Sequence, residues 1–78
     1  MKIEISGHAK ERMHDYNVPE ELVNETMRNP DRIEKSYGDR KIYQKKLNGY
    51  TLRVIVEENK EIKRVVTVYK ARSERYGI

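Results

Sequence analysis

The feature that most constrains the fold is a change in the spacing of apolar residues at Pro30. Before Pro30, Ala9, Met13 and Tyr16 are spaced so that they share one face of a helix over residues 8–16. After Pro30, apolar and polar residues alternate, which is typical of strands with one buried face. One change from helical to strand spacing predicts an α+β domain in which helices pack on a sheet.

The first part of the chain has the boundary signals of two short helices. Ser6 can cap the first helix with its side-chain oxygen, and Asn17 ends that helix. Pro19 opens the second helix because its missing N–H is not needed in a first turn. Asn29-Pro30 ends the second helix, whose apolar stripe is Leu22, Val23 and Met27. We therefore expect a two-helix hairpin, preceded by a short strand over residues 2–5.

The second part predicts four strands, over residues 32–37, 40–47, 50–57 and 61–71. Asn48-Gly49 between two of them indicates a tight hairpin, because both central residues of a type I′ turn need positive φ. Residues 65–68 are apolar on both faces, so the last strand is expected inside the sheet. The expected fold is a curved antiparallel sheet of about four strands, with the two-helix hairpin packed on one face.

The length and composition limit what this fold can contain. A chain of 78 residues with 36% hydrophobic residues forms one small domain, residues 1–78. The absence of cysteine excludes disulfides, thiolate metal sites and a thiol nucleophile. The longest aliphatic run is Val54-Ile55-Val56, far below the roughly 20 residues of a membrane span. We expect a cytoplasmic protein without a membrane segment, a signal peptide or a cofactor.

The basic charge is concentrated in the second half of the chain. Residues 1–39 carry six Lys and Arg against nine Asp and Glu, whereas residues 40–78 carry eleven against four. A positive surface on a small domain attracts polyanions through counterion release. The same charges would also serve solubility and surface ion pairs. We expect RNA to bind the uncovered side of the sheet, with contacts from Lys41, Lys45, Lys63 and Lys70, although alternation assigns the cations of these strands to both faces.

His8 and Arg12 lie four residues apart on the first predicted helix and so share a face. An imidazole transfers protons near neutral pH, and a guanidinium binds phosphate with two N–H groups. The pair therefore suits phosphodiester cleavage. In the structural alternative, His8 caps or packs the helix and Arg12 pairs with Asp15 or Glu11. His14 cannot share the face of His8, so no metal site is expected.

The end of the chain, residues 69–76, mixes cations with Tyr69 and Tyr76. Lys70 and Arg72 would bind phosphates there, while a tyrosine ring stacks on an unpaired base. In the alternative interpretation the terminus frays and Tyr69 packs into the core.

Several strings of the sequence together resemble one known family. They are Ser6-Gly7-His8-Ala9-Lys10-Glu11-Arg12-Met13, Val18-Pro19-Glu20-Glu21-Leu22, Asn29-Pro30 and Val66-Thr67-Val68-Tyr69. This set resembles a small domain-of-unknown-function branch of the RelE/ParE toxin superfamily. The resemblance covers nearly the whole chain and implies the fold of ribonuclease-like toxins, in which two helices pack on a curved antiparallel sheet.

The resemblance also implies site residues. RelE-type ribonucleases act at the ribosome without a metal, through sheet arginines and lysines and a C-terminal tyrosine. Tyr76 resembles that tyrosine in placement, and Lys70 and Arg72 resemble the basic pair. Thr51 stands where the family has an arginine after the hairpin glycine, and Arg53, two residues on, points to the same side and could take its place.

Two functions from different classes are therefore expected. The first is a toxin-like RNA endonuclease, or an RNA-binding relative, in which the ribose 2′-hydroxyl attacks phosphorus. His8 or Tyr76 would transfer the proton, and Arg12, Arg53 and Arg72 would stabilise the charge. The second is a non-catalytic module of the same fold that binds a protein, such as gyrase or an antitoxin. A housekeeping relative without toxicity is a third alternative.

Overall fold

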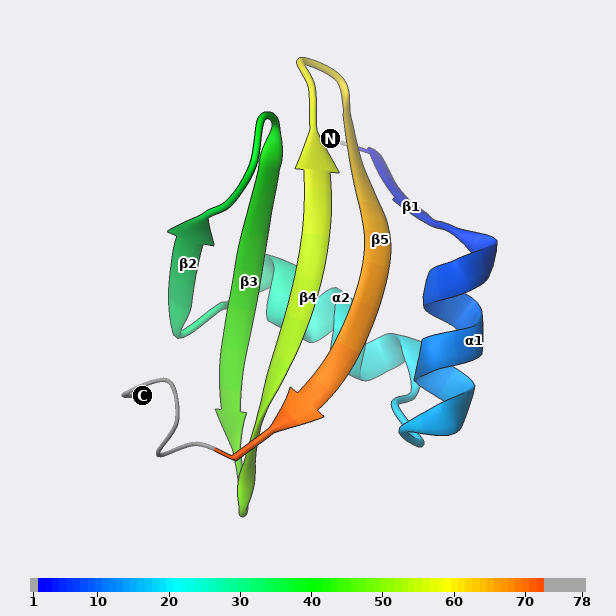
Figure 1. Ribbon diagram of the computed structural model, residues 1–78, viewed down its shortest axis with the longest axis vertical. Helices are drawn as coiled ribbons and strands as arrows, with labels where there is room; N and C mark the ends of the chain where they lie inside the picture. The colour runs from blue at the N-terminus through cyan, green and yellow to red at the C-terminus, as the bar shows by residue number, and fades with distance from the viewer. Residues whose placement is uncertain (1, 73–78) are drawn as a thin grey trace.

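The first strand, β1 (Lys2–Ile5), pairs with the last strand in this computed structural model, which describes residues 2–72. It runs parallel to β5 (Ile62–Ala71), with Ile5 opposite Val65. The other neighbours are antiparallel, and the strand order is β1-β5-β4-β3-β2 (Figure 1). The remaining strands are β2 (Arg32–Lys35), β3 (Arg40–Leu47) and β4 (Tyr50–Glu58).

The α+β class and the two helices are confirmed, but the sheet differs from the expected one. It has five strands within residues 2–72, and β1 makes it mixed rather than wholly antiparallel. The pairing of β1 with β5 joins the two ends of the described chain, so no local spacing of residues indicates it. The expected interior position of the last strand is confirmed, because β5 lies between β1 and β4.

The two helices begin and end close to the expected residues. The first, α1 (Gly7–Asp15), is capped by Ser6, whose Oγ accepts a hydrogen bond from the Ala9 N–H at 3.0 Å. Asn17 follows with a φ of +56°, which ends the helical geometry. The second, α2 (Glu20–Arg28), has Pro19 as its N-cap residue rather than its first helical residue.

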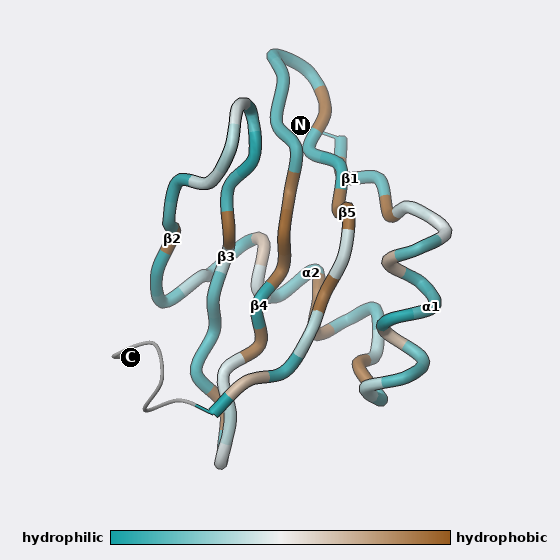
Figure 2. The backbone as a smooth tube through the Cα atoms, viewed as in Figure 1, coloured by the Kyte–Doolittle hydropathy of each residue, from teal (hydrophilic) through white to brown (hydrophobic). Residues whose placement is uncertain are grey.

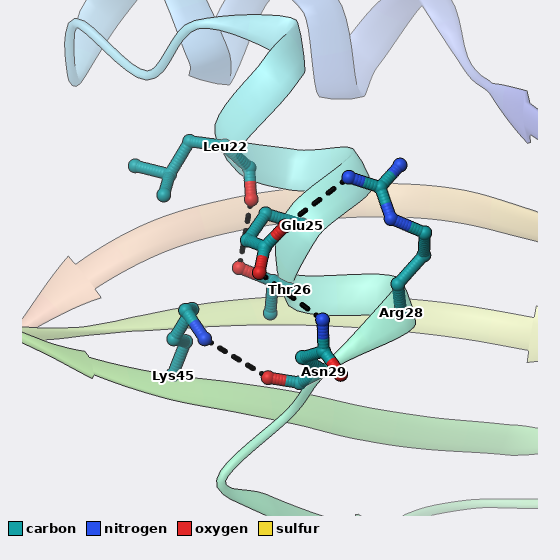
Figure 3. Close-up of polar contacts among 6 residues, drawn as sticks. All are labelled: Leu22, Glu25, Thr26, Arg28, Asn29 and Lys45. Atoms are coloured by element: carbon teal, nitrogen blue, oxygen red, sulfur yellow. Dashed lines mark hydrogen bonds and ion pairs between the residues drawn. The ribbon is translucent and has the colours of Figure 1, made fainter.

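Lys45 on β3 ties the end of α2 to the sheet. Its Nζ donates to the carbonyl oxygen of Asn29 at 3.0 Å (Figure 3). Within the last turn, Glu25 accepts hydrogen bonds from Arg28 at 3.1 Å and from the Asn29 amide at 3.2 Å. The bonds from Asn29 and Arg28 lower the pKa of Glu25. A cation beside the C-terminal carbonyls of a helix also suits the negative end of its dipole.

The hydrophobic core lies between the helices and one face of the sheet, which we call the helix face. Figure 1 shows α2 crossing behind β3 and β4, with α1 beside β5. The most hydrophobic stretch of the sheet lies in the middle of β4 (Figure 2). The core residues are Ala9, Met13, Val18, Val23, Met27, Tyr43, Leu52, Val54, Val56, Val65 and Val68.

The strand registers assign each side chain to the helix face or to the opposite face. On β4, Leu52 and Val54 point to the helix face, so Thr51 and Arg53 point to the opposite face, as the alternation predicts. The hairpin at Asn48-Gly49 is confirmed, because Leu47 pairs with Tyr50 across it. The expected type I′ geometry is wrong: Gly49 has a φ of +86°, but among the described residues other than glycine only Asn17 has a positive φ, so Asn48 does not. Within residues 2–72, no helix has the length and apolar composition to span a bilayer.

Candidate functional site

The opposite face of the sheet buries polar side chains at its centre. Gln44 and Thr51 are fully buried there, and Arg53 is only 6% exposed. Gln44 on β3 pairs with Arg53 on β4, which in turn pairs with Tyr69 on β5, so three neighbouring strands contribute. A buried guanidinium is costly unless it is paired, so its presence on a face that neither α1 nor α2 covers calls for a specific arrangement of partners.

Glu34 on β2 supplies that arrangement. One carboxylate oxygen, Oε2, lies 3.5 Å from Nη2 of Arg53. The other, Oε1, accepts a hydrogen bond from Nε2 of Gln44 at 2.9 Å and lies 3.5 Å from Nε of Arg32. The guanidinium carbon of Arg53 lies 5.6 Å from the centre of the Tyr69 ring. We call Arg32, Glu34, Gln44, Arg53 and Tyr69 the Glu34–Arg53 cluster.

One acceptor of this cluster is unsatisfied. The Oε1 atom of Gln44 is buried and has no hydrogen-bond partner among the residues described. The Glu34 carboxylate fixes the amide orientation, because a flipped amide would place oxygen against oxygen. A buried acceptor without a partner costs roughly 1 to 3 kcal/mol, and native proteins keep such groups mainly where function or strain explains them. The cluster is thus the best candidate site in the fold.

The structure places the expected catalytic residues, and the tyrosine expected to bind RNA, Tyr69, in different parts of the molecule. Arg53 and Tyr69 lie together in the cluster. His8 and Arg12 lie on α1, whose buried residues pack on the helix face. His8 is exposed, and Arg12 pairs with Asp15 at 2.7 Å, as in the structural alternative. Arg72 is exposed just beyond β5, and Tyr76 lies outside the described residues.

The four lysines expected to bind RNA point to the helix face or its margins. Lys41 pairs with Glu58 at 3.1 Å, and Lys45 contacts the end of α2. Lys63 donates to the Tyr43 hydroxyl at 2.9 Å, and Lys70 lies 4.6 Å from the centre of the Tyr50 ring. They therefore do not share a face with Arg53. The registers place other cations on that face, namely Arg32, Arg40, Lys46 and Arg64.

Tyr43, Glu58 and Lys63 form a second polar cluster at the margin of the helix face. The Tyr43 hydroxyl donates to Glu58 and accepts from Lys63. Burial and the bond to Glu58 raise the pKa of Tyr43. The bond to Tyr43 raises the pKa of Lys63. Burial alone would raise the pKa of Glu58, but hydrogen bonds from Tyr43 and Lys41 outweigh it and lower the pKa. Two of the lysines expected to bind RNA, Lys41 and Lys63, thus already make contacts within the protein.

Sequence reasoning missed Glu34, Gln44 and Arg32. Their spacing shows only that they lie on strands, and the register that brings Glu34 to Arg53 passes through β3. No sequence signal marks this contact. Among the residues described, no three His, Asp or Glu side chains are grouped so that they could hold a metal ion.

Comparison with curated proteins and with solved structures finds no match for the chain. One family model does match, over residues 5–70, which run from the last residue of β1 to the residue before the end of β5. The match includes both helices and all five residues of the Glu34–Arg53 cluster. The chain therefore belongs to the family described as a domain of unknown function, DUF4258.

Proposed function

We propose that this chain is a toxin-like RNA endonuclease of RelE/ParE type that works without a metal, and that the Glu34–Arg53 cluster is its site. The observation that carries the proposal is Arg53, a residue that is only 6% exposed and whose guanidinium lies against Glu34 on the face that the helices leave uncovered. A planar cation with a fixed orientation suits the binding of one phosphodiester. The excess of cations in the second half of the chain supports an anionic substrate.

The proposed reaction uses the nucleophile that RNA itself supplies. The ribose 2′-oxygen attacks the adjacent phosphorus and gives up its proton, and the bond from phosphorus to the 5′-oxygen breaks. The products are a 2′,3′-cyclic phosphate and a 5′-hydroxyl, which takes up one proton as it leaves. Arg53 would stabilise the charge on the phosphorane. Tyr76, which the family resemblance suggests for proton transfer, could serve the leaving oxygen.

Glu34 replaces His8 as the proposed acceptor of the 2′-hydroxyl proton. Its carboxylate is 3.5 Å from the Arg53 guanidinium, so it would flank a phosphate bound there. His8 belongs to α1, which packs on the other side of the sheet. A general base must lie within hydrogen-bond reach of the proton that it removes. This requirement favours Glu34 over His8.

The test measures cleavage of a labelled RNA in EDTA, with and without added ribosomes, by the wild type and by Glu34→Gln, Arg53→Lys and His8→Ala. Loss of a general base lowers the rate by about 10² to 10⁴, and loss of one electrostatic donor by about 10² to 10³. We expect Glu34→Gln and Arg53→Lys to lose at least a hundredfold, and His8→Ala to retain activity. Circular dichroism establishes that each variant is folded.

The outcomes separate the alternatives. If His8→Ala lowers the cleavage rate a hundredfold while Glu34→Gln keeps full activity, His8 rather than Glu34 accepts the proton. A wild type that leaves no cyclic phosphate ends under either condition would reject the endonuclease.

The second candidate function is binding of a protein partner, such as an antitoxin or gyrase, without catalysis. The observation that favours it is the exposure of two large hydrophobic residues at the β2 edge, Ile33 at 48% and Tyr37 at 89%. Salt dependence discriminates between the two functions. Affinity for single-stranded RNA falls with salt at a slope of about −0.7 per phosphate contacted, whereas a largely apolar protein contact has a flat dependence.

A further inference from the structure

A basic depression lies at the end of the sheet, away from the Glu34–Arg53 cluster. It has a volume of about 460 Å³ and lies between the turn that joins β2 to β3 and the turn that joins β4 to β5. Four cations line it, together with two acidic side chains, Asp39 and Glu58. The cations are Lys35, Arg40, Lys41 and Lys60.

Only two of these four cations make an ion pair. Arg40 lies 3.5 Å from Glu57, and Lys41 lies 3.1 Å from Glu58. In contrast, Lys35 and Lys60 make no ion pair with any residue of the described chain. Lys35 is the last residue of β2, and Lys60 lies on the turn between β4 and β5. The depression therefore has an unbalanced positive charge, which an anion can neutralise without breaking an existing pair.

The walls of the depression are hydrogen-bonded before any ligand binds. The Arg40 N–H donates to the Tyr37 carbonyl at 2.9 Å, and the Glu58 N–H donates to the Asp39 carbonyl at 3.0 Å. On the second turn, Oδ1 of Asn59 accepts from the N–H groups of Glu61 and Ile62, at 3.0 and 2.8 Å. Because the backbone of both turns is already ordered, the binding of an anion between them costs little backbone entropy.

Tyr37 does not line the depression, but it presents an exposed ring on the turn whose next residue, Gly38, does. It is 89% exposed and lies on the first turn, two residues after Lys35. Cations that follow a phosphate backbone, combined with an exposed aromatic ring, are the combination by which proteins bind single-stranded nucleic acid. A double helix would offer no free base face to the ring.

We propose that this depression is a second contact for single-stranded RNA, in which Lys35 and Lys60 bind phosphates and Tyr37 stacks on a base. The inference rests on the proposed function. Arg40 links the two sites, because its register with Glu57 places it on the same face as Arg53. Glu57 lies four residues along β4 from Arg53, which is about 13 Å at 3.3 Å per residue. Lys35 pairs with Lys41 and so points to the helix face. A strand bound at both sites would therefore pass around the end of the sheet and extend several nucleotides from the cleaved bond.

The test measures binding of a labelled single-stranded RNA by fluorescence anisotropy at several salt concentrations. The double variant Lys35→Ala, Lys60→Ala is compared with Lys2→Ala, Lys10→Ala, which removes the same charge from β1 and α1. We expect the first to reduce the magnitude of the salt slope by about 1.4, at 0.7 per phosphate, and the second to leave it unchanged. Tyr37→Leu should weaken binding about 5- to 150-fold, whereas Tyr37→Phe retains the ring and the affinity.

A dinucleotide substrate separates the two sites. It is too short to reach the depression, so Lys35→Ala, Lys60→Ala should cleave it at the wild-type rate while binding the long RNA more weakly. Equal salt slopes for the two double variants, or equal affinities for Tyr37→Leu and Tyr37→Phe, would overturn this inference and leave the proposed function intact. A wild type that does not bind single-stranded RNA would overturn both.

Discussion

The hydroxyl of Ser6 donates a hydrogen bond to the carbonyl oxygen of Val66 at 3.1 Å. The same oxygen accepts the Ala9 N–H at 3.0 Å. One side chain thus caps α1 and attaches it to β5. The Ser6 N–H also donates to the Val65 carbonyl at 3.0 Å, so the chain is held at the point where β1 ends and α1 begins.

Replacing Ser6 should therefore destabilise the fold through both bonds. Loss of an N-cap costs about 1 kcal/mol, and loss of one net hydrogen bond costs about as much again. We expect Ser6→Ala to lower the free energy of unfolding by about 2 kcal/mol in urea titrations. Ser6→Asp retains the cap acceptor but not the donor and should lose about half of that. Equal stability of Ser6→Ala and Ser6→Thr would contradict this assignment.

Gly49 should be less tolerant of alanine than Gly7. Gly49 has a φ of +86°, whereas Gly7 is the first residue of α1. A Cβ at either position meets no atom within 4 Å, so only the backbone conformation distinguishes them. We expect Gly49→Ala to lower the free energy of unfolding by about 1 to 2 kcal/mol, and Gly7→Ala to leave it unchanged or raise it slightly. Equal effects would mean that the hairpin turn does not need its glycine.

Lys45 and Lys46 should differ in what they support. Lys45 donates to the Asn29 carbonyl, whereas Lys46 is exposed and points to the opposite face with Thr51. We expect Lys45→Met to lower the free energy of unfolding by about 0.5 to 1.5 kcal/mol and to leave RNA affinity unchanged. Lys46→Met should weaken RNA binding without loss of stability. Melting curves and anisotropy on the same samples check both, and a reversed pattern would place the RNA on the helix face.

Glu58 should make the fold sensitive to acid. Its pKa is lowered in the folded state, so its stabilising effect is complete above the unfolded pKa of about 4.3 and is lost as the pH falls through the folded value. We expect the wild type to lose more stability between pH 6 and pH 3 than Glu58→Gln does. Urea titrations at several pH values measure this, and parallel curves would show that Glu58 is not stabilised by Tyr43 and Lys41.

Tyr43 and Lys63 should make the fold sensitive to alkali. Both have raised pKa values, which means that the folded state favours the neutral phenol and the charged amine. Their stabilising effect is present below about pH 10 and is lost as the pH rises through the folded values. In an absorbance titration of the tyrosines, Tyr43→Phe should remove a late-titrating group. If the group that Tyr43→Phe removes titrates together with the other tyrosines, the result contradicts the buried contact of Tyr43.

Most of the secondary structure could be predicted because its signals are local. The Ser6 cap, the end of α2 at Pro30 and the Asn48-Gly49 hairpin each depend on residues that are neighbours in the chain. The segment after Pro30 was predicted to extend to residue 37, but β2 ends at Lys35 because Ser36 and Tyr37 enter a turn closed by Arg40. Alternation alone does not locate such a turn.

The candidate site was predictable only in part. Arg53 and Tyr69 were named from the sequence, and they do meet across β4 and β5. Their carboxylate partner was not, because Glu34 reaches Arg53 across two strand boundaries. The charge distribution along the sequence also does not show which lysines share a face of the sheet with Arg53. Alternation sends Lys41 and Lys45 to the helix face and Arg53 to the other.

What this chain decides by itself is the kind and order of its elements, since helix caps, turn glycines and apolar spacing act over a few residues and need no partner. What only the folded molecule decides is which elements touch. The parallel edge of β1 on β5, the face on which each cation emerges and the placement of Glu34 beside Arg53 all depend on strand register. Register is set by how the whole sheet packs on α1 and α2, because a shift of one residue would expose the core and bury the charges.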